Sequence, residues 1–156
     1  MKTMRKTGIA AIVIILAASN LTGKIGEIKA TGSLLIPTAS GEKLYKGVIT
    51  ITRTEIEIEC DKKIFRPFNE FEVPKQAKIR VNTVEVERIC IQENDILILP
   101  GEPLYRRYRY LFHEIMEICF WCFPYKKALI FSLDNRADIG PAGIEIFRLI
   151  NKQSRE

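Results

Sequence analysis

The sequence contains a single histidine, His113, and this scarcity excludes several kinds of catalytic centre. A zinc-protease helix holds its metal with two histidines one turn apart, and here the second position is Glu117. A serine–histidine–acid triad uses imidazole as its base, but no triad motif surrounds His113. The chain also lacks a glycine-rich phosphate loop and a dinucleotide-binding fingerprint. The sequence therefore favours a protein that is not an enzyme, and no cofactor is expected.

Cysteine is also scarce, because four residues in 156 are too few for a disulfide scaffold. Cys119 and Cys122 form a Cys-x-x-Cys pair. In thioredoxin-like proteins such a pair opens a helix, whose N-terminus lowers the thiol pKa. Here the pair is expected to close a helix, where the dipole opposes the thiolate. We therefore favour the interpretation that the two cysteines are buried as small apolar side chains. The alternatives are a redox pair and a zinc site that also uses Cys60 and Cys90.

Positive charge is in excess, but it is unevenly distributed. The formal net charge is +5, and Lys2, Arg5 and Lys6 lie within the first six residues. Without residues 1–19 the chain has 21 basic and 19 acidic side chains. So small an excess is not the electrostatic footprint of a nucleic-acid-binding protein. The expected partner is therefore a protein or a membrane surface, and not a nucleic acid.

The first 19 residues have the layout of a signal peptide or an N-terminal membrane-anchor segment. A basic start precedes the uncharged run GIAAIVIILAA at residues 8–18, and small residues extend to Ser19. The run is shorter than the roughly 20 apolar residues that span a bilayer. Two interpretations stay open: an exported or membrane-associated protein, which we prefer, or a cytoplasmic domain that buries this segment in its core.

Short runs with strand periodicity follow from residue 48 onward. In residues 48–52 and 55–60, isoleucines alternate with threonines or glutamates, and residues 84–91 continue this pattern. Residues 96–99 and 128–133 are apolar runs bounded by polar turns. A period of two places one set of side chains in the core and the other in water. The pattern predicts a mainly antiparallel β meander that forms a small barrel or sandwich.

The apolar spacing changes to three or four residues in the last third of the chain. This spacing predicts an amphipathic helix near residues 104–123, which Pro124 would end. A Gly-Pro step opens a second, C-terminal helix near residues 141–152. No linker or repeat separates a second unit, so residues 25–154 are predicted to form a single, strand-rich α+β domain.

Two segments resemble the pleckstrin-homology-like superfamily: GVITIT at residues 47–52 and IFRPFNEFEV at residues 64–73. In bacterial and archaeal members of that superfamily, a step of isoleucine, proline and apolar residues often follows the opening strand pair. The archaeal taxis adaptor family, which links chemotaxis proteins to the archaellum motor, carries a similar step. The resemblance implies a strand meander closed by a C-terminal helix, and a non-enzymatic binding module or a cytoplasmic signalling adaptor. It assigns no site residues.

A cluster of cations and aromatic side chains is the candidate contact surface. The sequence RRYRY at residues 106–110 interleaves the two kinds, and two lysines follow the predicted helix. Such a cluster can contact lipid headgroups or an acidic partner. It is also typical of a solvated helix face whose long side chains cover tyrosine rings. The candidate contact residues are Arg106, Arg107, Arg109, Lys126 and Lys127.

Three functions follow from these observations. The first is a binding module of pleckstrin-homology-like shape, associated with a membrane. The second is a cytoplasmic signalling adaptor of the same shape. The third is a small redox or zinc protein that uses Cys119 and Cys122.

Overall fold

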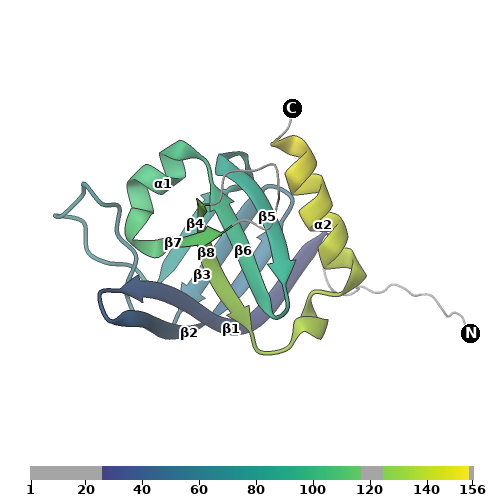
Figure 1. Ribbon diagram of the computed structural model, residues 1–156, viewed down its shortest axis with the longest axis horizontal. Helices are drawn as coiled ribbons and strands as arrows, with labels where there is room; N and C mark the ends of the chain where they lie inside the picture. The colour runs from purple at the N-terminus through teal and green to yellow at the C-terminus, as the bar shows by residue number, and fades with distance from the viewer. Residues whose placement is uncertain (1–25, 117–124, 155–156) are drawn as a thin grey trace, which may run out of the picture.

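The computed structural model describes residues 26–116 and 125–154 (Figure 1). The segment of residues 1–19, with its predicted signal or anchor, lies outside the described residues, as do Cys119 and Cys122. Within the two described ranges, no helix combines the length and the apolar character needed to cross a membrane.

The described part of the chain forms an eight-stranded antiparallel sheet (Figure 1). The strands are β1 (Glu27–Thr38), β2 (Gly41–Thr52), β3 (Glu55–Cys60), β4 (Lys78–Asn82), β5 (Val86–Gln92), β6 (Asp95–Pro100), β7 (His113–Met116) and β8 (Tyr125–Leu133). Their order is β4-β3-β2-β1-β8-β6-β5, and β7 pairs with the first half of β8. The predicted antiparallel sheet is confirmed. Of the predicted barrel or sandwich, a closed barrel is wrong, because the sheet is open and ends at β4 and β5.

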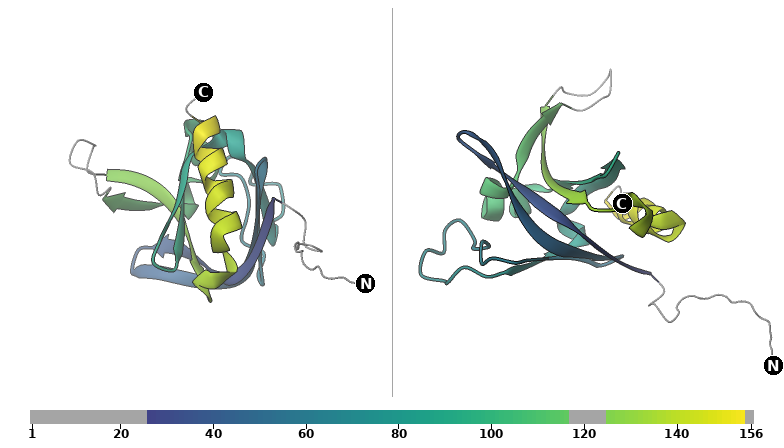
Figure 2. Two further views of the ribbon diagram at one scale, coloured as in Figure 1. Left: turned by 90° about the vertical axis from the view of Figure 1, so that its right-hand side faces the viewer. Right: turned by 90° about the horizontal axis from the view of Figure 1, so that it is seen from below.

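The sheet twists and bends strongly between its two halves (Figure 2). Gly32 of β1 and Gly47 of β2 lie directly opposite each other. A Cβ atom at Gly32 would lie 2.1 Å from the carbonyl oxygen of Ser132 on β8, and one at Gly47 would lie 2.4 Å from that of Glu59 on β3. Both neighbours are backbone atoms, so a side chain at either position would push the strands apart. The glycine pair therefore permits the close strand contacts at the bend.

Both halves of the sheet contribute to one main hydrophobic core. Phe131 and Ile96 from the β8–β6 half are fully buried with Ile49 and Ile58 of β2 and β3. The alternation in residues 48–60 thus places the isoleucines inward, as predicted. Burial of these side chains is the main favourable term that holds the two halves together.

The C-terminal helix α2 (Gly140–Gln153) packs beside the edge strand β5 (Figure 2) and confirms the helix predicted near residues 141–152. It buries Phe147 in the core. Asn151 Oδ1 accepts a hydrogen bond from the Ile89 N–H, and its Nδ2 donates one to the Ile89 carbonyl, both at 2.8 Å. The amide thus occupies the place of a neighbouring strand and blocks this edge against pairing with another chain.

The helix predicted near residues 104–123 is confirmed only at its start, and it is wrong in its length. Helix α1 (Glu102–Tyr108) is followed by a 3-10 turn (Arg109–Leu111), and β7 (His113–Met116) then pairs with β8. Leu104 is buried as the helical spacing predicted. Beyond the turn, pairing with the next strand along the chain outweighs the local helical preference, which is only a weak determinant of structure.

Replacing Asn151 by alanine should destabilise the domain by about 1–3 kcal/mol, because the Ile89 N–H and C=O lose their partners. Urea unfolding followed by circular dichroism measures this change. The exposed Lys152 on the same helix provides the control, and Lys152→Ala should leave the free energy of unfolding within about 0.5 kcal/mol of the wild type. An Asn151→Ala protein as stable as the control would contradict the edge-capping role.

Candidate functional site

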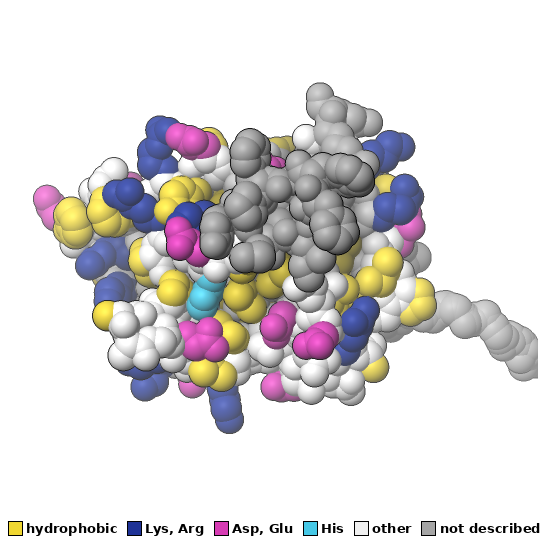
Figure 3. Space-filling model, viewed as in Figure 1, with side chains coloured by type: hydrophobic (Ala, Val, Ile, Leu, Met, Phe, Trp, Pro, Cys, Tyr) yellow, Lys and Arg dark blue, Asp and Glu magenta, His cyan; other side chains and the backbone are white. Residues whose placement is uncertain are grey.

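The candidate site is the corner where the loop of residues 61–77 meets α1 and the 3-10 turn. We call residues 61–77 together with 102–111 the basic–aromatic corner. It contains seven basic and four acidic side chains, whereas the rest of residues 20–156 contains 14 basic and 15 acidic ones. Figure 3 shows hydrophobic side chains at the left edge of the molecule with lysines and arginines around them. The excess positive charge of the domain is therefore concentrated at this corner.

Tyr110 joins the loop to the 3-10 turn. Its Oη donates a hydrogen bond to the Ile64 carbonyl and accepts one from the Arg66 N–H, each at 3.0 Å. The Phe68 N–H also donates to the Arg107 carbonyl at 2.7 Å. Partial burial raises the pKa of Tyr110, which keeps its hydroxyl protonated and able to donate. These bonds hold the loop in a defined position beside α1.

Two arginines of the corner are already paired with carboxylates. Arg107 Nη1 and Nη2 contact Glu85 Oε2 and Oε1 at 3.0 and 2.9 Å, a bidentate pair that links α1 to the segment before β5. The hydrogen bond to Glu85 raises the pKa of Arg107. Arg106 Nη2 lies 2.6 Å from Glu102 Oε1, one turn earlier on the exposed face of α1. Arg107 therefore supports the fold, and the exposed pair at Arg106 contributes little to stability.

Arg66, Lys75 and Arg109 have no carboxylate partner among the described residues. The guanidinium carbon of Arg109 lies 4.5 Å from the centre of the Phe68 ring, and that of Arg66 lies 6.0 Å from the centre of the Phe71 ring. A cation above an aromatic face keeps N–H groups available to an anion. These three cations, rather than the paired arginines, can therefore contact an anionic partner.

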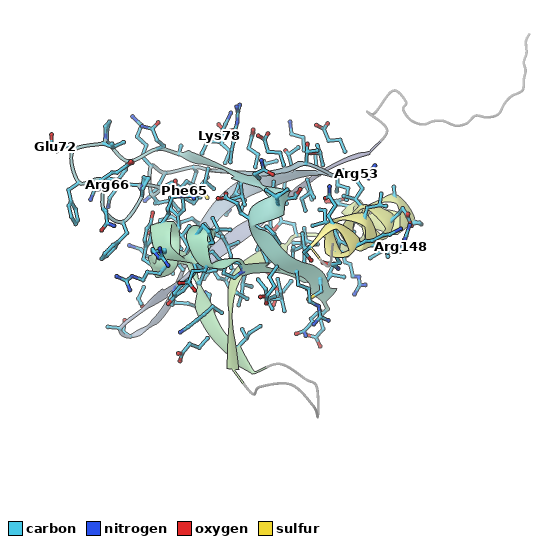
Figure 4. All side chains as sticks on the ribbon, turned by 90° about the horizontal axis from the view of Figure 1, so that it is seen from above. Arg53, Phe65, Arg66, Glu72, Lys78 and Arg148 are labelled. Atoms are coloured by element: carbon cyan, nitrogen blue, oxygen red, sulfur yellow. The ribbon has the colours of Figure 1, made fainter. Side chains whose placement is uncertain are left out.

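Apolar side chains project from the same loop. Phe71 is 72 % exposed, Phe68 40 % and Val73 39 %, whereas Phe65 at the base of the loop is 2 % exposed. Figure 4 shows Arg66 and Glu72 on the part of the loop that projects beyond the sheet. A shallow pocket of about 200 Å³ lies between the loop and the 3-10 turn. Large apolar side chains gathered at one exposed place mark an interaction site.

Lys127, one of the two predicted lysines, does not join the unpaired cations. Lys127 Nζ lies 2.6 Å from Glu114 Oε1 on the neighbouring strand and 6.0 Å from the centre of the Tyr105 ring. The side chain of Lys126 lies outside the described residues. The structure therefore gathers the three predicted arginines on α1 and the 3-10 turn, and it places Lys127 in an ion pair on the sheet.

Sequence reasoning missed Arg66, Lys75 and the exposed aromatic side chains of the loop. A signal was present in the sequence, because Phe68 and Phe71 lie in a segment with two prolines that matches no strand pattern. Apolar residues that no predicted element can bury are candidates for a contact surface. Only the folded chain places them beside Arg109, some 40 positions later in the sequence.

Cys60 and Cys90, two of the four cysteines that the sequence offered as metal ligands, are not brought together. Cys60 on β3 lies in the main core, and burial raises its pKa to about 12. Cys90 on β5 packs with Leu97 on the opposite face of the sheet. Cys119 and Cys122 lie outside the described residues. In the described ranges, no three His, Cys, Asp or Glu side chains gather in a way that could hold a metal ion.

Replacing Tyr110 by phenylalanine should loosen the loop and destabilise the domain by about 1–3 kcal/mol, since the hydrogen bonds to Ile64 and Arg66 are lost. Urea unfolding measures the free energy, and limited proteolysis measures cleavage within residues 61–77. Tyr108→Phe is the control, because the Tyr108 hydroxyl has no hydrogen-bond partner in the described part of the chain. Equal cleavage rates in the two variants would refute the anchoring role of Tyr110.

The basic–aromatic corner thus combines the unpaired cations Arg66, Lys75 and Arg109 with exposed aromatic rings and a shallow pocket, on a loop that Tyr110 anchors. Guanidinium, ammonium and phenyl groups in such an arrangement can bind anions and apolar groups together. No protein-family model and no curated protein matches the chain.

Proposed function

We propose that this domain is a non-enzymatic binding module of pleckstrin-homology-like shape that contacts an anionic partner through the basic–aromatic corner. The observation that carries this proposal is the set of unpaired cations Arg66, Lys75 and Arg109 around exposed aromatic rings. Outside the corner, residues 20–156 are close to electrically neutral. An anionic partner is therefore attracted to this one part of the surface.

The architecture supports the proposed shape. The resemblance implies a strand meander closed by a C-terminal helix. The observed strand order β4-β3-β2-β1-β8-β6-β5 and the packing of α2 against β5 agree with that arrangement. The short helix α1 and strand β7 are inserted between β6 and β8. This insertion supplies half of the basic–aromatic corner.

The chemistry of the corner supports binding rather than catalysis. Its unpaired cations are arginines and a lysine, and a guanidinium remains charged and does not exchange protons near neutral pH. Burial raises the pKa of Tyr110, so this phenol is not a base at neutral pH. The surface is thus suited to hold an anion in place and to contact an apolar group beside it.

Charge reversal at the corner should weaken binding to an anionic surface. The triple variant Arg66→Glu, Lys75→Glu and Arg109→Glu of the full chain should elute from a sulfonated resin at roughly half the salt concentration of the wild type, since its cations no longer meet the surface together. The measurement is retention on the resin in a salt gradient at neutral pH.

A matched variant separates the corner from the net charge of the protein. Lys29, Lys46 and Lys152 are exposed and lie outside the corner. Their replacement by glutamate changes the net charge by the same amount, and this variant should elute clearly later than the corner variant. If both triple variants elute together, the corner is not the anion-binding surface and the proposal fails.

A further inference from the structure

We infer that the anionic partner of the corner is a lipid bilayer surface, and that the tip of the loop inserts Phe71 and Val73 among the lipid headgroups. This inference rests on the proposed function and names its partner. It is carried by the position of the exposed apolar side chains relative to the unpaired cations.

The aromatic side chains at the tip of the loop do not serve the core. Phe65, at the base of the same loop, is 2 % exposed and fills the interior, whereas Phe71 is 72 % exposed. The rings of Phe68 and Phe71 lie 6.4 Å apart, so they form one apolar cluster, and Val73 extends it. Removing this cluster from water is favourable in proportion to its apolar area. In the folded domain alone these side chains stay in contact with water, so this favourable free energy is not obtained.

The unpaired cations lie beside this apolar cluster. Arg109 lies against Phe68, Arg66 lies against Phe71, and Lys75 lines the same pocket. Long basic side chains keep their charge in water while their stems lie along apolar surface. When the rings enter the bilayer, these charges would lie at the level of the phosphates of anionic lipids.

The shape of the loop favours a bilayer over an acidic protein. The loop projects beyond the sheet (Figures 1 and 4), and the hollow beside it is only a shallow pocket. A protein partner would need a cavity complementary to Phe71 as well as carboxylates for the cations, whereas a fluid bilayer accepts an apolar tip without such a match. Glu72 lies at the outer end of the loop and is turned away from α1 (Figure 4). The inferred contact face is the one where Arg109 lies against Phe68.

The test is co-sedimentation of the full chain with vesicles. The probes are vesicles of phosphatidylcholine alone and vesicles with about a quarter phosphatidylserine. Phe71→Ser should lower the partition onto the anionic vesicles about tenfold, because one large apolar side chain no longer leaves water. Leu44→Ser is the matched control. Leu44 is 61 % exposed on the β1–β2 hairpin outside the corner, and its variant should bind within about twofold of the wild type.

A second measurement reports insertion directly. Phe71→Trp adds a second tryptophan to the single native one, Trp121. Brominated lipids quench a tryptophan that enters the bilayer. The Phe71→Trp protein should therefore lose a larger fraction of its fluorescence on brominated anionic vesicles than the wild type does.

The outcomes distinguish this inference from the proposed function. If Phe71→Ser binds anionic vesicles as the wild type does, insertion is overturned, while retention on the sulfonated resin still tests the charge-based contact. If the wild type is retained by the resin in a corner-dependent way but shows no preference for anionic vesicles, the partner is an acidic protein and the inference fails. Circular dichroism melting curves that match the wild type confirm that each variant is folded.

Discussion

β1 joins the two halves of the molecule, and the rest of the structure depends on its close approach to β8. One edge of β1 pairs with β2 along its whole length, and the other pairs with β8 over residues 32–35. At Gly32 the two strands lie so close together that an added Cβ atom would be 2.1 Å from the carbonyl oxygen of Ser132. Because β1 connects both halves, the inward side chains of Ile49 and Phe131 share one core.

An open sheet has two free edges, and the chain treats them differently. At β5 the Asn151 amide forms hydrogen bonds with the N–H and the carbonyl of Ile89. Helix α2 thereby protects this edge, and it also packs against the core. At β4 the outward side chains are Lys78 and Arg80, and both contact Glu57 on β3. Charged side chains on an edge strand oppose pairing with another chain. Both edges are therefore protected against pairing, and the contact surface that we propose lies on a loop.

The basic–aromatic corner is an assembly of parts that are distant in sequence. Tyr110 positions the loop by bonding to its backbone at Ile64 and Arg66, and Arg107 ties α1 to Glu85. Fixing these backbone segments leaves the exposed rings and unpaired cations side by side. The charged groups that hold the fold are thus separate from those that remain available to a partner. This division explains why neighbouring arginines in one short sequence have different roles.

Local sequence patterns predict the antiparallel strands, such as the period-two run that buries Ile49 and Ile58, and they predict the C-terminal helix. The sequence did not reveal β1, because Ala30 and Gly32 occupy inward positions and weaken the apolar alternation. Nor did it reveal the end of α1, because the spacing of apolar residues does not encode the pairing of β7 with β8, the next strand along the chain. The arginines of the candidate surface were visible as a cluster of charge in the sequence. Which of them remain unpaired, and that Phe68 lies beneath Arg109, was decided only by the tertiary structure, since an ion pair or a ring contact depends on distances in space.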